Sequence, residues 1–149
     1  RILANIAITS IKSFFFAILT SLIWGVAPAL EKAGLNSRID PFLGVVIRTI
    51  PIAVIAFAAA IFLGRLSSIS TVDTKSAAFI AAGGIVASLI GQIVFYTALK
   101  DGEVSLVVPV AATYPLVALL ISIVFLGEVF TWQKFAGAGL VVAGVMFLR

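Results

Sequence analysis

The side chains best able to bind a solute are a few polar and aromatic groups set into long apolar runs. Guanidinium, amide, hydroxyl and aromatic groups hold a polar solute through charge, hydrogen bonds and stacking, but they supply neither a nucleophile nor a general base. The sequence contains no Cys and no His. We therefore assign no catalytic residue, no metal site and no cofactor, and we do not expect an enzyme. The candidate substrate-binding residues are Trp24, Arg48, Gln92, Tyr96, Thr113 and Tyr114.

One charged residue, Arg48, lies well inside an apolar run, about 9 Å past Phe42 at the helical rise of about 1.5 Å per residue. A long basic side chain can extend its charge to the membrane surface while its carbons stay in lipid. Alternatively, an intramembrane cation is held because it pairs with an acid such as Glu31 or receives a substrate carboxylate. The sequence leaves both interpretations open.

A polar stripe follows the third apolar run, because Ser88, Gln92, Tyr96 and Lys100 are spaced four apart and share one face of a helix. Such a stripe on an apolar helix indicates a polar path or site. The alternative is that Ser88 bonds to its own backbone and Tyr96 is an interfacial aromatic residue.

Three prolines, Pro28, Pro109 and Pro115, lie in apolar runs and are expected to kink helices. Proline has no N–H and therefore leaves a carbonyl of the preceding turn without its helical partner. Next to a cavity, such carbonyls can accept hydrogen bonds from a ligand. Equally, the prolines can serve only to bend helices for packing.

The elements that must position these residues are membrane helices. The 149 residues are 62% hydrophobic and 11% charged, against about 25% charged in a globular protein, so the solvent is lipid. About 20 apolar residues cross a hydrocarbon core about 30 Å thick. The only Met is Met146, so Arg1 is not expected to be a translation start. We predict an all-α membrane protein with an N-terminal lead-in (1–12) and one domain (13–149), a bundle of five transmembrane helices at about 13–30, 42–64, 76–99, 104–127 and 129–148.

Small residues recur four apart on several of these segments, where they allow helix backbones to approach closely in lipid. The alternative is that Ala and Gly are simply common in this chain. The stripes are Ser21, Gly25 and Ala29; Ala56, Ala60 and Gly64; and Gly83, Ala87 and Gly91. We expect helix contacts at Gly25, Gly83, Ala87 and Gly91, and also at Gly137 on the fifth segment.

The candidate residues share a depth. An odd number of crossings puts the termini on opposite sides, named here face A (N-terminal) and face B. Counting inward from face B at about 1.5 Å per residue, Trp24, Arg48, Gln92 and Thr113 fall roughly 9 to 14 Å deep, and Tyr114 slightly deeper. A polar layer near the midplane is typical of transporter substrate sites.

The basic residues give no orientation. Besides Arg48, five lie on face A (Arg1, Lys12, Arg65, Lys75, Lys134) and four on face B (Lys32, Arg38, Lys100, Arg149). Because neither face has a clear excess of Lys and Arg, the positive-inside rule predicts no orientation. The same near balance would permit insertion in both directions. Scattered single charges suit lipid headgroups rather than nucleic acid. We expect the bilayer as a partner, together with an antiparallel homodimer or a second five-helix unit.

Several short motifs occur in an order that resembles the EamA family of the drug/metabolite transporter superfamily, in its single-copy, five-helix bacterial or archaeal form. The matching residues are Leu22–Gly25, Pro28, Glu31 and Lys32; Arg48; Gly91, Gln92 and Tyr96–Leu99; Pro109 and Tyr114–Leu116; and Leu126–Glu128, Gly137, Gly139 and Ala143–Val145.

The resemblance implies transport of a small metabolite or drug-like solute across the cytoplasmic membrane of a bacterium or archaeon by a multi-pass protein. It also implies that this chain is one half-unit of an inverted-repeat transporter. Small-multidrug relatives carry a proton-coupling acid in the first helix, whereas none lies between Ser13 and Leu30. Proton antiport of that kind is therefore not expected. The alternatives are a non-transporting membrane subunit or the isolated half of a ten-helix transporter.

Overall fold

The protein was analysed as a computed structural model, which describes residues 2–35 and 38–148, with the backbone alone for residues 2–10. Every regular element in these residues is a helix. Helix α1 (Ile2–Gly34) forms one compact unit, and a second begins at Leu35. Arg1 and Arg149, which the sequence analysis placed on opposite faces, lie outside the described residues.

Helix α1 is longer than the predicted segment 13–30, because it includes both the lead-in from Ile2 and one more turn after Leu30. No proline or glycine interrupts the apolar sequence before Gly25, so nothing stops the helix from starting early. Lys32 lies in the last turn, where a cation is favoured by the helix dipole. The part of α1 from Ile11 to Gly34 is long and apolar enough to cross a membrane.

Helix α2 (Pro41–Phe62) has clear boundaries at both ends. Asp40 caps its start, since Oδ1 accepts hydrogen bonds from the backbone N–H groups of Phe42 and Leu43 at 2.9 and 3.1 Å. Pro41 in the first turn loses no helical hydrogen bond. Gly64, with a φ of 64°, follows the last turn in the left-handed conformation that ends helices.

The third apolar run is a single span, Thr74–Asp101, with a change of helix type inside it. A short 3-10 helix, η1 (Leu66–Thr71), precedes it. Asp73 caps the start of the span, because its carboxylate accepts a hydrogen bond from the backbone N–H of Ser76 at 2.9 Å. The hydrogen bonds from Ser76 lower the pKa of Asp73 below its usual value. Within the span, α3 (Thr74–Gly84) passes into a π-helical segment, η2 (Ile85–Gly91), and then into α4 (Gln92–Asp101).

The fourth run, predicted as one helix over 104–127, is broken. It consists of α5 (Val104–Ala111) and α6 (Tyr114–Leu126), separated by Ala112 and Thr113. Pro109 inside α5 cannot donate to the preceding turn, and Pro115 lies in the first turn of α6, where its missing N–H costs nothing. The two prolines therefore lie on either side of the break.

Helix α7 (Trp132–Met146) is shorter than the predicted segment 129–148. Gly127, with a φ of 67°, ends α6, and an irregular stretch continues to Thr131, whose hydroxyl caps α7 by accepting from the Lys134 N–H at 3.3 Å. The fifteen residues of α7 cover about 22 Å. In the described residues, four helices are long and apolar enough to span a membrane, within α1, α2, α3–α4 and α5–α6. The fifth crossing stays a prediction.

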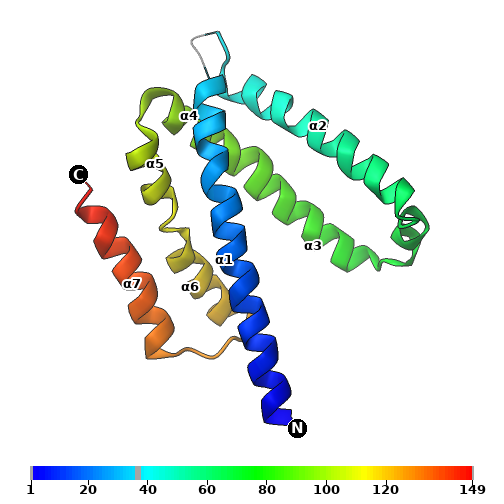
Figure 1. Ribbon diagram of the computed structural model, residues 1–149, viewed down its shortest axis with the longest axis vertical. Helices are drawn as coiled ribbons and strands as arrows, with labels where there is room; N and C mark the ends of the chain where they lie inside the picture. Colours follow the sequence, from blue (N-terminus) through cyan, green and yellow to red (C-terminus); the bar gives the residue numbers. More distant parts are fainter. Residues whose placement is uncertain (1, 36–37, 149) are drawn as a thin grey trace. The chain divides into compact units, whose positions relative to one another are not determined.

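Helices α2 and α4 are neighbours in the second unit and run in opposite directions (Figure 1). The N-terminal end of α2 meets the C-terminal end of α4, where Lys100 Nζ donates to the carbonyl of Ile39 at 3.1 Å. A small core forms at this end from Val45, Tyr96 and Leu99. The side chains packed around it are Leu35, Ile93, Phe95, Val104 and Val107.

The closest backbone approach in this core is at Gly44. A Cβ atom added there would lie 2.9 Å from Cδ2 of Tyr96 and 3.2 Å from Cδ2 of Leu35. The ring of Tyr96 therefore lies directly on the backbone of α2, a position that only glycine leaves open. Close approach at a small residue is how helices gain packing energy in lipid.

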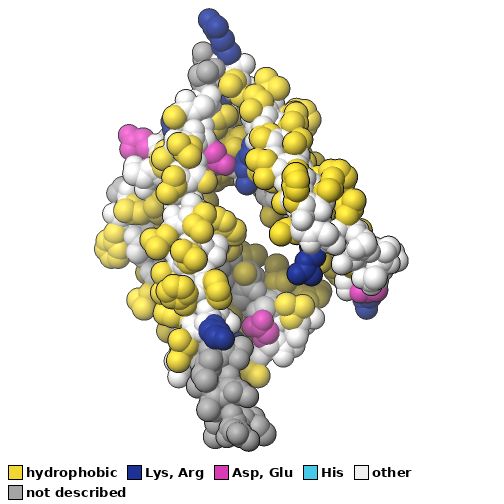
Figure 2. Space-filling model, turned by 45° about the vertical axis from the view of Figure 1, so that its right-hand side comes forward, with side chains coloured by type: hydrophobic (Ala, Val, Ile, Leu, Met, Phe, Trp, Pro, Cys, Tyr) yellow, Lys and Arg dark blue, Asp and Glu magenta, His cyan; other side chains and the backbone are white. Residues whose placement is uncertain are grey.

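Away from this core the helices expose apolar side chains. All residues from Lys75 to Gly91 are exposed. Apolar groups cover much of the surface seen in Figure 2, and charged groups are few. Such a surface suits lipid or another membrane helix, as the composition indicates.

The contact at Gly44 predicts the effect of adding one methyl group. We expect Gly44→Ala to lower the free energy of unfolding by about 1–3 kcal/mol, because the new Cβ overpacks against the Tyr96 ring. Gly84→Ala is the matched control, since a Cβ there meets nothing within 4 Å. Thermal unfolding in detergent, followed by circular dichroism, measures both. Equal melting temperatures for the two variants would contradict the assigned contact.

Candidate functional site

The predicted site residues lie on three parts of the chain. Trp24 lies in α1 with Gly25 and Pro28, outside the unit that holds the others. Arg48 lies in α2, and Gln92 and Tyr96 lie in α4. The remaining two, Thr113 and Tyr114, lie at the break before α6.

The register of α2 against α4 brings Arg48 level with Gln92. Two contacts fix this register: Ile39 meets Lys100, and Gly44 meets Tyr96. Because the helices are antiparallel, one further turn of four residues on each leads from Gly44 to Arg48 and from Tyr96 to Gln92. Both side chains are half-buried. The structure therefore places a guanidinium and an amide at one level of the helix pair.

Tyr96 belongs to the core of this pair. Its side chain is 3% exposed and packs on Gly44. In this structure the ring therefore fixes the spacing of α2 and α4 one turn from Arg48. A direct contact between Tyr96 and a substrate remains a prediction.

The polar stripe of the third run is shortened by the π-helical segment. Residues four apart share a face in an α-helix, whereas the hydrogen bonds of a π-helix join residues five apart and change the register. Ser88 lies inside η2 and is exposed, while Gln92, Tyr96 and Lys100 follow α-helical spacing along the side that packs on α2. The stripe in contact with α2 thus begins at Gln92.

Gly91 ends the π-helical segment at a tight point of the backbone. A Cβ there would lie 3.1 Å from the carbonyl oxygen of Val86, five residues earlier. π-Helical turns inside α-helices are frequent at functional sites. This one directly precedes Gln92.

The break between α5 and α6 lies at about the same level. The turn between α4 and α5 is centred on Gly102, where a Cβ would come within 2.6 Å of Cγ2 of Val107. Gln92 is ten residues before Gly102 and Thr113 is eleven residues after it. Thr113 bonds twice to the Val110 carbonyl next to the break, from its hydroxyl at 2.8 Å and from its backbone N–H at 3.2 Å. Tyr114 is exposed.

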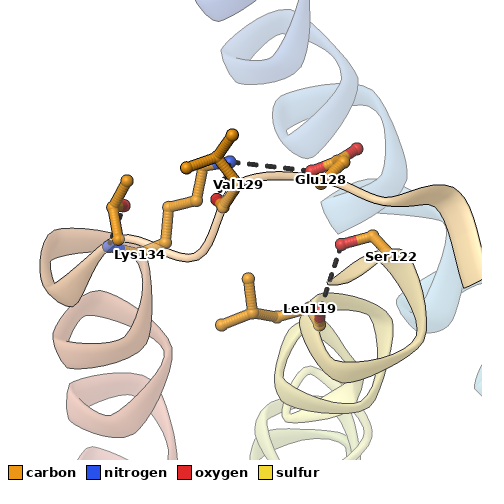
Figure 3. Close-up of polar contacts among 6 residues, drawn as sticks. Leu119, Ser122, Glu128, Val129 and Lys134 are labelled. Atoms are coloured by element: carbon orange, nitrogen blue, oxygen red, sulfur yellow. Dashed lines mark hydrogen bonds and ion pairs between the residues drawn. The ribbon is translucent and has the colours of Figure 1, made fainter. Parts of the chain in front are cut away.

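A separate polar cluster lies in the stretch that joins α6 to α7. Lys134 Nζ lies 3.6 Å from Oε2 of Glu128 and donates to the Val129 carbonyl at 3.4 Å (Figure 3). Nearby, the Ser122 hydroxyl donates to the Leu119 carbonyl at 3.0 Å. Both charged side chains are about half exposed, so the ion pair stabilises this stretch only slightly.

The close contact between α2 and α4 is not made by any of the glycines named from small-residue spacing. A Cβ at Gly83 or Gly137 would meet nothing within 4 Å, and Ala87 is exposed. The glycine on which α4 packs is Gly44, which the sequence analysis did not single out. Its signal is its position four residues before Arg48, on the same side of the helix.

Proline Pro51 was also overlooked, although it lies inside α2 just beyond Arg48. It removes a helical hydrogen bond to the carbonyl of Ile47.

Among the described residues no group of three or more acidic, Cys or His side chains is placed to hold a metal ion. What the layer can do chemically is bind a polar or anionic group through Arg48, Gln92 and backbone carbonyls freed by prolines.

Four apolar helices of membrane-spanning length within the described residues define a multi-pass membrane protein. The model of the EamA-like transporter family matches residues 11–149, and the chain belongs to this family. An uncharacterized protein of Methanocaldococcus jannaschii, MJ1333.1, is 35% identical over 60 residues, which cover 40% of this chain and 44% of the relative. The chain thus spans less than half the length of that curated relative. No solved structure matches the chain.

The register of α2 on α4 can be tested by cross-linking, because the chain has no Cys of its own. We expect a bifunctional maleimide to join cysteines placed at positions 48 and 92, since these lie level on neighbouring helices. The control pair, positions 48 and 88, should join poorly because position 88 lies in the π-helical segment. Mass spectrometry of the products measures both yields, and better joining of the control pair would refute the register.

Proposed function

We propose that this chain transports a small metabolite or drug-like solute across the cytoplasmic membrane of a bacterium or archaeon, by alternating access in a paired five-helix assembly. Membership of the EamA-like transporter family gives the class. The observation that carries the proposal is the position of Arg48, half-buried inside the span of α2 and level with Gln92.

A charge inside a membrane span is unfavourable unless polar groups of the protein or a bound solute interact with it. Placing Arg near the centre of a membrane helix costs about 2.5–3.5 kcal/mol on insertion scales. Arg48 lies two helical turns inside α2 and one turn beyond the Gly44 contact. A guanidinium binds carboxylate or phosphate oxygens through two parallel hydrogen bonds, and the Gln92 amide adds a donor and an acceptor at the same level. An anionic or strongly polar solute group is the ligand that this pair suits.

The helical irregularities support the same proposal. Transporter sites are commonly formed where membrane helices are discontinuous, because freed backbone groups then line a cavity instead of meeting lipid. Here η2 ends at Gly91 and the α5–α6 break includes Thr113, both next to the level of Gln92. We include Trp24, Thr113 and Tyr114 in the proposed substrate site on the basis of their depth.

The proposed paired assembly rests on the charge balance between the two faces. In the proposal, α7 is the fifth crossing, and its fifteen residues span the core by local thinning of the bilayer. A second copy inserted in the opposite direction supplies the other half of an inverted repeat. Nearly equal numbers of basic residues on the two faces allow this double insertion.

Substitution of Arg48 tests the site. A thermal-shift screen of carboxylate and phosphate metabolites first identifies a stabilising solute, and its uptake is then measured in proteoliposomes. We expect Arg48→Ala to abolish uptake without loss of expression, and Arg48→Lys to recover little because the bidentate geometry is lost. Arg65→Ala is the matched control, since Arg65 is exposed beyond the end of α2. Full uptake by Arg48→Ala would show that the arginine only extends to the membrane surface.

The orientation of the C-terminus tests the assembly. A C-terminal tag is probed for exposure in intact cells and again in opened cells. We expect a mixed population, because an antiparallel homodimer needs both orientations from one gene product. A uniform orientation would rule out that homodimer. It would favour pairing with a different five-helix unit or a non-transporting subunit, and uptake by the purified chain alone separates these two.

A further inference from the structure

Three aromatic residues at the start of α7 form a cluster that the proposed transport site does not use. The ring centroids of Phe130 and Trp132 are 5.5 Å apart, those of Trp132 and Phe135 are 5.9 Å apart, and those of Phe130 and Phe135 are 6.0 Å apart. Each ring therefore contacts the other two, with two of the three pairs edge to face. Such pairs contribute about 0.5–1.5 kcal/mol each beyond their buried area.

Local backbone structure holds the cluster together. Thr131 caps α7, which fixes the first turn and puts Trp132 and Phe135, three residues apart, on one side of it. Phe130 lies just before the cap and packs on both rings. The cluster is thus an ordered feature rather than three separate side chains.

The cluster is nevertheless open to its surroundings. Trp132 is 73% exposed, Phe130 45% and Phe135 41%. The rings pack on one another and are not part of the core of the unit, which lies around Tyr96 beside the turn between α4 and α5. A large exposed aromatic surface of this kind needs a partner other than water.

Charged groups border the same rings. Lys134 lies between Trp132 and Phe135 in sequence, and its ammonium group pairs with Glu128 and bonds to the Val129 carbonyl (Figure 3). The irregular backbone between Gly127 and Thr131 also brings polar groups to this level. Neither an ion pair nor irregular backbone exposed to lipid is tolerated in the hydrocarbon core. The three rings therefore require an apolar environment, whereas the Lys134–Glu128 pair beside them requires water or polar headgroups.

We propose that Phe130, Trp132 and Phe135, together with Lys134, form a docking surface for the headgroup boundary of the phospholipid bilayer. Of the three rings, the indole of Trp132 has the polar N–H that favours this boundary, the two phenylalanine rings add apolar area beside it, and the ammonium group of Lys134 with its carboxylate partner Glu128 lies on the polar side. The surface sets the depth of α7. Because the first turn of this short helix is held at the boundary on face A, its remaining residues point into the membrane from a fixed level. This assignment does not depend on which solute is transported.

The depth of Trp132 tests the assignment. Trp24→Phe leaves Trp132 as the only Trp of the full chain. The protein is reconstituted in vesicles of phosphatidylcholine and phosphatidylglycerol carrying bromine either near the headgroup or near the chain ends. We expect stronger quenching of Trp132 by the shallow bromines, with a depth within about 10 Å of the headgroup boundary. Stronger quenching by the deep bromines overturns the proposal, and so does no quenching by either lipid, which would mean water or a protein partner.

A second variant tests whether the cluster itself sets this depth. In the Trp24→Phe background, Phe130→Ala with Phe135→Ala removes both neighbours of Trp132. We expect the preference for shallow over deep bromines to be lost, because a single ring without its partners is no longer held at one level. The matched control is Phe79→Ala with Phe125→Ala, two exposed phenylalanines on α3 and α6. An unchanged quenching profile in the first double variant, at unchanged helicity, overturns the role of the cluster.

Discussion

The ring of Tyr96 lies on the bare backbone of Gly44, and the remaining arrangement of the second unit depends on this contact. In water, helices associate because their apolar faces leave the solvent, but lipid tails are as apolar as leucine and offer no such gain. What remains is close packing. The missing side chain at Gly44 allows α2 and α4 to approach, Val45 and Leu99 then become buried, and Val104 and Val107 of α5 pack on the same core. The contact also sets the register that brings Arg48 level with Gln92.

The second constraint is that backbone polar groups in lipid must find partners within the protein. The chain departs from regular α-helix at η2 and at the α5–α6 break, and in each case the local structure compensates. A π-helical turn keeps its hydrogen bonds with wider spacing, and the Thr113 hydroxyl donates to the Val110 carbonyl beside the break. Both departures lie close to the level of Gln92, where a solute could take the place of lipid.

The sequence allowed the class of the fold to be predicted, but not the details that build the site. Long apolar runs predict membrane helices because their length must match the bilayer, and α1, α2 and the third run appear as single spans. Where helices stop depends on local capping, so Thr131 shortens α7 beyond what hydropathy indicates. The π-helical turn has no clear sequence signal, and it removed Ser88 from the stripe. Small-residue spacing suggested Gly83 and Gly137, and their helix contacts stay a prediction, whereas the close contact at Gly44 became visible only once the fold placed the Tyr96 ring on it.

The distribution of packing bears on the proposed pairing with another five-helix unit. Around Gly44 the helices are tightly packed, whereas one turn further along Arg48 and Gln92 are only half-buried, and beyond them η2 and α3 are exposed. Arg48 and Gln92 thus lie where the close packing around Gly44 ends. Lipid over the exposed parts of Arg48 and Gln92 would be unfavourable, since insertion scales assign about 2.5–3.5 kcal/mol to an arginine at the centre of a membrane helix. A second five-helix unit in that place would replace lipid with polar groups and enclose the layer. The same helices that leave the layer open in one unit would then form the walls of a cavity between two.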